Sequence, residues 1–194
     1  MAVRRGQVFV VGALLFGAMI VSLFLVATGG GLQDAGPETP RFLFKWGMDE
    51  YPRVVNLAAA ENDSARHLRN RITSYLQFQR YVVERRGATM TAHSLVTVPN
   101  GTDTNAVLTN ARGAAMEDTT LSVAGTEKSI GSLPAGDTRI LTFSDTPSQF
   151  RVNLSFTDGK DFDHRETWSG QRITALYRLK IEAAQQTWVD TRTY

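Results

Sequence analysis

Cysteine is absent from the 194 residues, and catalytic motifs are scarce. The lack of thiols excludes disulfides, thiolate metal ligands and cysteine nucleophiles. The only histidines, His67, His93 and His164, lack the spacing of a zinc site. There is no Gly-x-Ser-x-Gly elbow and no glycine-rich phosphate loop. We therefore predict no catalytic residue, no metal site and no cofactor, and keep an anchored envelope hydrolase only as the least favoured reading.

A charge excess of either sign is also missing from most of the chain. The formal net charge of +2 comes from Arg4 and Arg5 at the amino terminus, and the remaining cations and anions are equal in number. Binding to nucleic acid needs a concentrated basic stripe. The main basic cluster, Arg66, Arg69 and Arg80, lies on a predicted helix, and we interpret it as a solvated face. The distribution of charge argues against a nucleic-acid partner.

The most prominent feature present is one long apolar run near the amino terminus. Gln7–Ala27 contains no charged residue, and only Gln7 and Ser22 have polar side chains. A helix of this length rises roughly 30 Å, the thickness of the hydrocarbon layer of a bilayer. Residues 1–28 are therefore predicted to form a basic terminus and a transmembrane helix, with the lipid bilayer as partner.

The distribution of cations predicts the orientation of this helix. Arg4 and Arg5 precede the run, and the next Lys or Arg is Arg41. The positive-inside rule then places the amino terminus in the cytoplasm and everything after Thr28 outside. The prediction is a single-pass protein of the cell membrane. A cleaved secretory signal is the alternative, but its apolar region usually spans only ~7 to 15 residues.

The residues beside the run carry a resemblance. Arg4-Arg5-Gly6-Gln7, followed directly by an apolar helix, resembles the archaeal class III signal peptide. The resemblance implies that a prepilin-type peptidase cuts after Gly6, and that pilin-like or other envelope proteins are partners. Type IV pilins commonly have Glu at the fifth mature position, where this chain has Val11. An uncleaved signal anchor remains the equal alternative.

Two segments connect the predicted span to a folded region. Residues 29–40 are rich in Gly and Pro and are predicted to be a linker. Residues 41–87 are predicted to be an amphipathic helical region, beginning near Met48 with Pro52 in its first turn. A break is expected near Asn62, and apolar residues then recur at helical spacing from Ala65. The aromatic residues of 41–46 lie beside two cations and would suit a membrane surface as well as a core, and we favour packing in a core.

After Gly87 the spacing of apolar residues changes from the roughly 3.6-residue period of a helix to the two-residue period of a strand. Ile173–Ile181 alternates most regularly, and Val152, Leu154 and Phe156 alternate with polar neighbours. Residues 88–194 are predicted to form an antiparallel β-sandwich. Gly131–Thr138 is similar to connections in immunoglobulin-like extracellular modules, so the predicted class is α+β with an immunoglobulin-like sandwich.

One acidic run has the composition of a candidate cation site. Asp158–Glu166 offers several carboxylates in a predicted turn, and calcium binds such oxygens. The run fails the EF-hand pattern because Lys160 is at the third loop position and no glycine is at the sixth. We interpret it as a charged hairpin turn.

The sequence contains three sequons. Asn62, Asn100 and Asn153 each begin an Asn-x-Ser/Thr triplet without proline and are candidate glycosylation sites. The expected function is that of an anchored extracytoplasmic protein with a structural or adhesive role, pilin-like by resemblance. The alternative is a surface module that binds a glycan or an envelope protein without polymerising.

Overall fold

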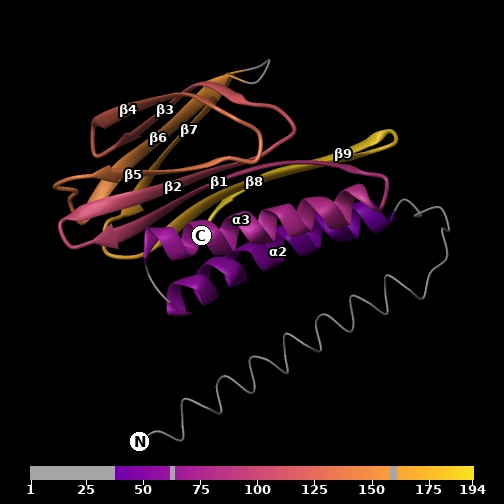
Figure 1. Cartoon of the computed structure of the whole chain (residues 1–194), viewed down its shortest axis with the longest axis horizontal. Helices are drawn as coiled ribbons and strands as arrows, with labels where there is room; N and C mark the ends of the chain where they lie inside the picture. Colours follow the sequence, from indigo (N-terminus) through magenta and orange to yellow (C-terminus); the bar gives the residue numbers. More distant parts are fainter. Residues whose placement is uncertain (1–37, 62–63, 158–160) are drawn as a thin grey trace, which may run out of the picture. The chain divides into compact units, whose positions relative to one another are not determined.

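Two helices and nine strands form the described part of the chain, which comprises residues 38–61, 64–157 and 161–194 of a computed structural model (Figure 1). The predicted α+β class with an antiparallel sandwich is confirmed. The helices are α2 Glu38–Glu61 and α3 Ala65–Glu84. The strands are β1 Thr89–Asn100, β2 Asp103–Ala111, β3 Met116–Val123, β4 Thr126–Leu133, β5 Thr138–Phe143, β6 Gln149–Thr157, β7 Asp161–Ser169, β8 Thr174–Ala183 and β9 Gln186–Thr193.

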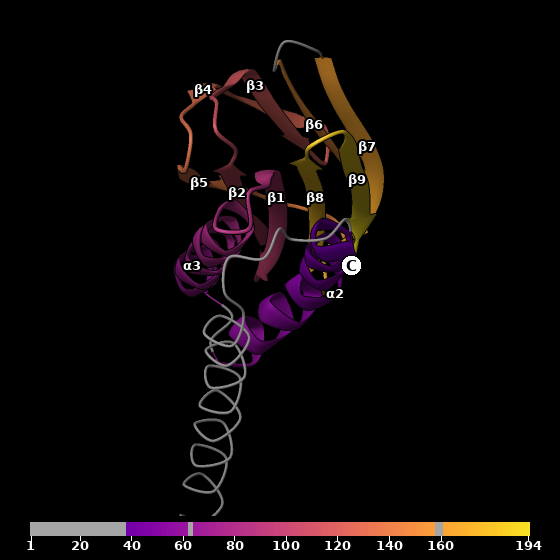
Figure 2. The same ribbon diagram turned by 90° about the vertical axis from the view of Figure 1, so that its right-hand side faces the viewer.

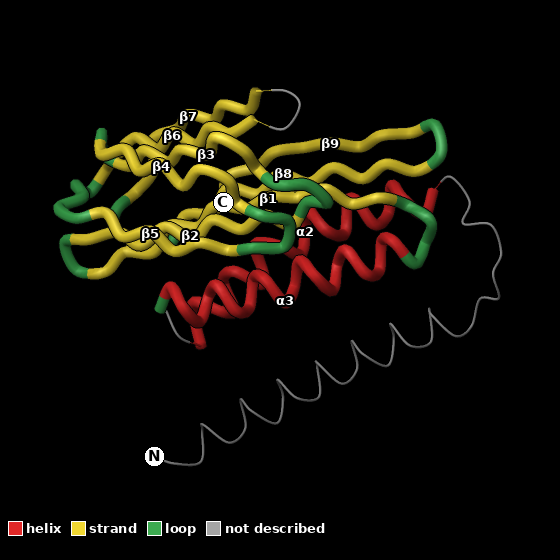
Figure 3. Tube along the Cα trace, turned by 45° about the horizontal axis from the view of Figure 1, so that its top comes forward, coloured by secondary structure: helices red, strands yellow, loops and turns green. Residues whose placement is uncertain are grey.

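The strands form two sheets in which every pair is antiparallel. One sheet has five strands in the order β5-β2-β1-β8-β9, and the other has four in the order β4-β3-β6-β7 (Figure 3). Hairpins join β1 to β2, β3 to β4, β6 to β7 and β8 to β9. The long-range pairing of β1 with β8 joins the early and late hairpins into one sheet.

Three layers result, because both helices lie on the outer face of the five-stranded sheet (Figure 2). One apolar core lies between the helices and this sheet, and a second lies between the two sheets. The inner strands β1, β2 and β8 of the five-stranded sheet are therefore buried on both faces. In β1 every residue from Ala92 to Val98 is buried. Ala92 and Val96 belong to the core under the helices, whereas Leu95 belongs to the core between the sheets.

Helix α2 begins well before the predicted start at Met48. Its first residue is Glu38, so the last three residues of the predicted linker are helical. Pro52 therefore lies inside the helix rather than in its first turn. A proline there leaves the carbonyl four residues earlier without its usual amide donor. That carbonyl belongs to Met48, and it accepts a hydrogen bond from the Tyr194 hydroxyl at 2.8 Å.

The expected core packing of the aromatic residues at the start of α2 is confirmed for Phe44, which packs against the core under the helices, and is wrong for Phe42. Leu43 is buried, but Phe42 is 67% exposed, and Phe44 and Trp46 are only partly buried. Helical periodicity explains this result, because Phe42 and Trp46 are one turn apart on the face turned away from the sheet, whereas Leu43 faces it.

Helix α3 follows the predicted pattern. The Ser64 side chain caps its start by accepting a hydrogen bond from the His67 amide at 3.3 Å. Leu68, Ile72, Leu76 and Val83 form its buried stripe. The predicted periodicity from Ala65 onward is thus confirmed.

A set of buried polar and aromatic contacts joins the helices to β1 and β8. The Tyr51 ring stacks on the Tyr177 ring with centroids 4.0 Å apart. The Tyr51 hydroxyl donates to Ser94 Oγ at 2.6 Å, and the Tyr177 hydroxyl donates to Gln79 Oε1 at 2.8 Å. Burial raises the pKa of both tyrosines well above the ordinary value, so both hydroxyls stay protonated and donate. The helical layer is therefore held by directional bonds in addition to apolar contact.

The acidic run interpreted as a hairpin turn is strand for most of its length. Asp161–Ser169 forms β7 and pairs with β6 from Thr157↔Asp161 to Gln149↔Ser169. The turn interpretation is wrong for residues 161–166, and residues 158–160 lie outside the described residues. Because β7 is an edge strand, it tolerates many charged residues, and the alternation of apolar and polar residues that indicates a strand is therefore weak in its sequence.

Candidate functional site

The outer face of the four-stranded sheet is a candidate contact surface in the described part of the chain. The helices cover the other sheet, so polar side chains of the neighbouring strands β3, β6 and β7 meet solvent here. We call this surface the bare sheet face. Its outward residues are Ser122, Arg151, Asn153, Ser155, Asp163, Arg165 and Thr167.

Two hollows adjoin on the bare sheet face. The larger has a volume of about 600 Å³ and the smaller about 280 Å³, and both are lined by Asn153 and Arg165. Arg151 also lines the larger hollow, whereas Asp118 and Asp163 line the smaller one. The surface therefore changes from cationic to anionic along β6. Arg165 lies at the boundary and pairs with Asp163 at 2.9 Å.

Asn153 lies at the centre of this surface. It pairs with Arg165 of β7 and with Ser122 of β3, so it is on an inner strand with neighbours on both sides. Its Oδ1 is buried and has no hydrogen-bond partner in the described residues. An amide with spare hydrogen-bonding capacity between charged neighbours is suited to binding a polar ligand, such as a sugar hydroxyl or a peptide group.

The predicted site residues fall in different places. Asn100 is exposed at the end of β1, where Gly101 has φ of 66° in the tight turn to β2. Asn153 is partly buried on the bare sheet face. The processing residues Arg4, Arg5, Gly6 and Gln7, the span of residues 7–27, and the sequon residue Asn62 lie outside the described residues.

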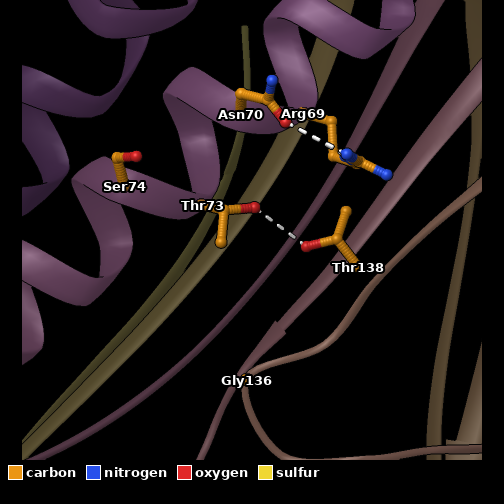
Figure 4. A pocket seen from close by; sticks show the side chains of 6 residues that line it. All are labelled: Arg69, Asn70, Thr73, Ser74, Gly136 and Thr138. Atoms are coloured by element: carbon orange, nitrogen blue, oxygen red, sulfur yellow. Dashed lines mark hydrogen bonds between the residues drawn. The ribbon is translucent and has the colours of Figure 1, made fainter.

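A third hollow, of about 330 Å³, lies where α3 meets the segment between β4 and β5 (Figure 4). Its polar groups are bonded locally. Thr73 Oγ1 and Thr138 Oγ1 lie 3.0 Å apart and join the helix to β5, and the Arg69 guanidinium donates to Asn70 Oδ1 at 3.2 Å. The polar residues of this hollow are therefore explained by the packing of α3 against the sheet, and they do not indicate a ligand site. Arg69, predicted to belong to a solvated face, lines this hollow.

A buried histidine lies between the sheets near two arginines. The His93 ring meets the Phe156 and Phe162 rings edge-on, with centroids 5.0 and 4.7 Å apart. The Arg112 guanidinium lies over Phe156 and the Arg178 guanidinium over Phe162. Burial, together with the positive charges of Arg178 and Arg112, lowers the pKa of His93 to about 3. The imidazole is therefore neutral at physiological pH.

A carboxylate joins the open edges of the two sheets. Glu166 of β7 accepts hydrogen bonds from Thr193 of β9, from the Trp168 indole at 3.1 Å, and lies 3.2 Å from the His164 ring. Burial alone would raise the pKa of Glu166, but the hydrogen bonds from Thr193 and Trp168 and the contact with His164 bring it below its ordinary value. The Thr193 hydroxyl bonds to the carboxylate and not to the imidazole, so the group lacks the nucleophile–base–acid order of a hydrolytic triad.

The sequence placed Glu166 in an acidic run and His93 among histidines without zinc spacing, but it did not predict the contacts that these two residues make in the structure. The available signal for His93 was the alternation along β1, where His93 and Leu95 point to the opposite face from Ala92 and Val96. The clusters themselves depend on strands far apart in the chain. Within residues 38–61, 64–157 and 161–194, no group of three His, Asp or Glu side chains is placed to hold a metal ion.

Comparison with protein-family models and with curated proteins finds no match for the chain. Neither α2 nor α3, the helices that the structure describes, is long and apolar enough to span a bilayer. The case for function therefore rests on the sequence patterns and on the geometry of the described residues.

Proposed function

We propose that the chain is a single-pass protein of the cell membrane whose folded domain lies on the extracytoplasmic side, where it has a structural or adhesive role. The observation that carries this proposal is the uncharged run Gln7–Ala27, preceded by Arg4 and Arg5 and followed by no further Lys or Arg before Arg41. The described residues, which follow this run in the sequence, form a domain with two apolar cores.

The bare sheet face is the proposed contact surface. It combines an unbonded amide oxygen on Asn153 with flanking charges of both signs, and it adjoins hollows of about 600 and 280 Å³. Such a polar, lightly hollowed surface suits a glycan or another envelope protein better than an apolar ligand.

The proposed module is immunoglobulin-like. Among the first seven strands, β5-β2-β1 lie in one sheet and β4-β3-β6-β7 in the other. An immunoglobulin-type sandwich likewise separates its strands between two antiparallel sheets, with consecutive strands crossing from one to the other. On this proposal β8 and β9 extend the first sheet beyond β1, and they provide part of the surface on which the helices dock.

The proposal includes processing of the class III type. A prepilin-type peptidase would recognise Arg4 and Arg5, cut after Gly6 and leave the apolar helix on the mature chain. The signal-anchor alternative retains residues 1–6. Mass spectrometry of the mature terminus separates them, because a chain starting at Gln7 supports processing, whereas one starting at Met1 or Ala2 contradicts it.

Fractionation tests the anchoring itself. In the native host, the chain should remain in the membrane pellet after a high-pH carbonate wash, and protease added to intact cells should degrade the described domain. Release by carbonate would contradict the span, and full protection from protease in intact cells but not in lysed cells would contradict the orientation.

A binding module that does not polymerise is the second candidate, and the hollows around Asn153 favour it. Purified surface filaments distinguish the two, because a structural subunit is present in them in stoichiometric amount. Its absence from filaments, with the chain still anchored in the membrane, would support the binding module.

A further inference from the structure

Four aromatic side chains form an exposed cluster where the start of α2 lies beside the end of α3. Phe42 is 67% exposed, Tyr81 is 54% exposed and Phe78 is 41% exposed. The partly buried Trp46 connects them, since it is one turn after Phe42 and its ring meets that of Phe78 edge-on at 6.5 Å. We call Phe42, Trp46, Phe78 and Tyr81 the aromatic cluster.

Exposed cations border the aromatic cluster. Arg41 and Lys45 flank Phe42 on α2, and Arg85 lies one turn after Tyr81 with its guanidinium 5.4 Å from the centre of that ring. The nearby carboxylate of Glu84 is held by Arg80 at 2.6 Å. Asp49 and Glu50, one turn after Trp46, pair with Arg192 at 3.6 Å and with Arg53 at 3.3 Å. The carboxylates near the aromatic cluster are thus paired, and Arg41, Lys45 and Arg85 are the cations that border it.

This composition matches the chemistry of a lipid headgroup layer. Trp and Tyr have an apolar body and a polar tip, and they gather where hydrocarbon meets water. Arg and Lys near such rings are attracted to anionic headgroups. We propose that the aromatic cluster docks on the anionic headgroup layer of the membrane that anchors the chain, an inference that rests on the proposed span of residues 7–27.

The short stretch of chain between the predicted span and α2 keeps the headgroup layer within reach of the aromatic cluster. Ten residues separate Ala27 from Glu38. At 3.3–3.6 Å per residue, ten residues reach at most about 35 Å. Phe42 lies in the second turn of α2, so a membrane-embedded run keeps the aromatic cluster close to lipid at a high effective concentration. A weak interfacial contact is then sufficient, whereas a free partner would have to bind without this tether.

The absence of cysteine provides a direct test on the full chain. Gln77→Cys places a nitroxide label on the exposed face of α3 beside Phe78 and Tyr81 and leaves the aromatic cluster intact. Thr167→Cys is the matched control on the bare sheet face. Both labelled chains are reconstituted in vesicles of phosphatidylcholine and phosphatidylglycerol in equal parts. Collisions with oxygen, which enters lipid, are compared with collisions with a water-soluble nickel complex.

The label at position 77 should show an oxygen-to-nickel collision ratio several-fold above that at position 167. Phe42→Ser with Tyr81→Ser, or Arg41→Gln with Lys45→Gln and Arg85→Gln, should lower the ratio at 77 to that of the control. In pure phosphatidylcholine the ratio should also fall. An undiminished ratio in phosphatidylcholine would overturn the part assigned to the cations.

The outcomes separate this inference from the proposed function. If the chain resists carbonate but the label at 77 behaves as that at 167, docking is overturned and anchoring stands. If the label at 77 is reached by neither oxygen nor nickel, a second copy or another protein covers the cluster and docking on lipid is overturned. If carbonate releases the chain, anchoring and docking fail together.

Discussion

The Tyr194 hydroxyl donates to the Met48 carbonyl across 146 residues of sequence. That carbonyl lies four residues before Pro52, which has no amide hydrogen to offer it. The hydroxyl therefore replaces the missing helical donor, and it joins the residue after β9 to α2 at the point where Pro52 interrupts the helical hydrogen bonds. Because Tyr194 also pairs with Ala175 through its backbone, the hydroxyl is held in place by the sheet.

A double-mutant cycle tests this replacement. Tyr194→Phe should lower the free energy of unfolding by about 1 kcal/mol, because the Met48 carbonyl loses its donor. In a Pro52→Ala background, where residue 52 regains an amide hydrogen, the same change should cost much less. Urea denaturation gives the four values. Tyr81→Phe, at an exposed hydroxyl, should have no effect, and equal costs in both backgrounds would refute the compensation.

At Gly47 we predict that alanine is less stable than glycine, which is the opposite of their helix propensities. Glycine inside a helix is ordinarily about 1 kcal/mol less stable than alanine. A methyl group at Gly47, however, would overlap the Gln79 side-chain amide and lie 2.9 Å from a Leu179 methyl. Gln79 cannot move freely, because it accepts the Tyr177 hydroxyl. Gly47→Ala should therefore destabilise the chain by about 1–3 kcal/mol.

Thermal unfolding and two further variants check the Gly47 prediction. Gly113→Ala is the matched control, since nothing lies within 4 Å of its added carbon, and it should be close to neutral. In a Gln79→Ala background the cost of Gly47→Ala should shrink, because the overlapping amide is gone. A stabilising effect of Gly47→Ala would contradict the close approach of Gly47 to the Gln79 side chain.

His93 predicts a particular dependence of stability on pH. Its pKa is lowered from 6.5 to about 3 by burial and by Arg178, Arg112 and His164. Between these values the unfolded chain binds a proton that the folded chain does not. The free energy of unfolding should therefore fall as the pH drops below 6.5, by at most about 1.4 kcal/mol per pH unit from this group.

Denaturation at several pH values between 6.5 and 5 isolates the His93 contribution from carboxylates such as Glu166, which titrate lower. His93→Leu, similar in volume and unable to titrate, should flatten the slope. His67→Gln, which removes a histidine from the surface of α3, should leave most of the slope of the free energy of unfolding against pH. A slope unchanged by His93→Leu would contradict the neutral buried imidazole.

Glycan occupancy should differ between the two described sequons in a host that modifies surface proteins. Asn100 is exposed in a tight turn, whereas Asn153 is partly buried in an inner strand. The hydroxyl of the second sequon, Ser155, also lies 2.7 Å from the Thr120 hydroxyl. Asn100→Gln should remove more glycan mass than Asn153→Gln. Glycopeptide mass spectrometry measures both, and equal occupancy would contradict the argument from accessibility.

The elements with strong periodicity were predictable from the sequence. The stripe from Ala65 gives α3, and the alternation from Ile173 to Ile181 gives β8. What the alternation could not reveal is that β8 is buried on both sides. Leu176 lies in the core between the sheets, while Tyr177 and Leu179 lie under the helices.

The edge strands and the start of α2 were not predictable in the same way. β4, β7 and β9 are edge strands with many polar residues, and only their pairing partners define them. Proline is ordinarily expected in the first turn of a helix, so Pro52 favoured a start near Met48. In the structure α2 starts earlier, and the amide donor that Pro52 lacks is replaced by the hydroxyl of Tyr194, which is remote in sequence. The hollows around Asn153 likewise require β3, β6 and β7 side by side, which no local pattern encodes.

The pairing of β1 with β8 has a consequence for biosynthesis. Thr97 must wait for Thr174, 77 residues later, before the centre of the five-stranded sheet can close. At ribosomal rates of about 5–20 residues per second, that delay is about 4 to 15 s. During this interval the nascent β1–β2 hairpin leaves the β1 edge unpaired and aggregation-prone, so a chaperone that shields exposed strands is most useful in this window.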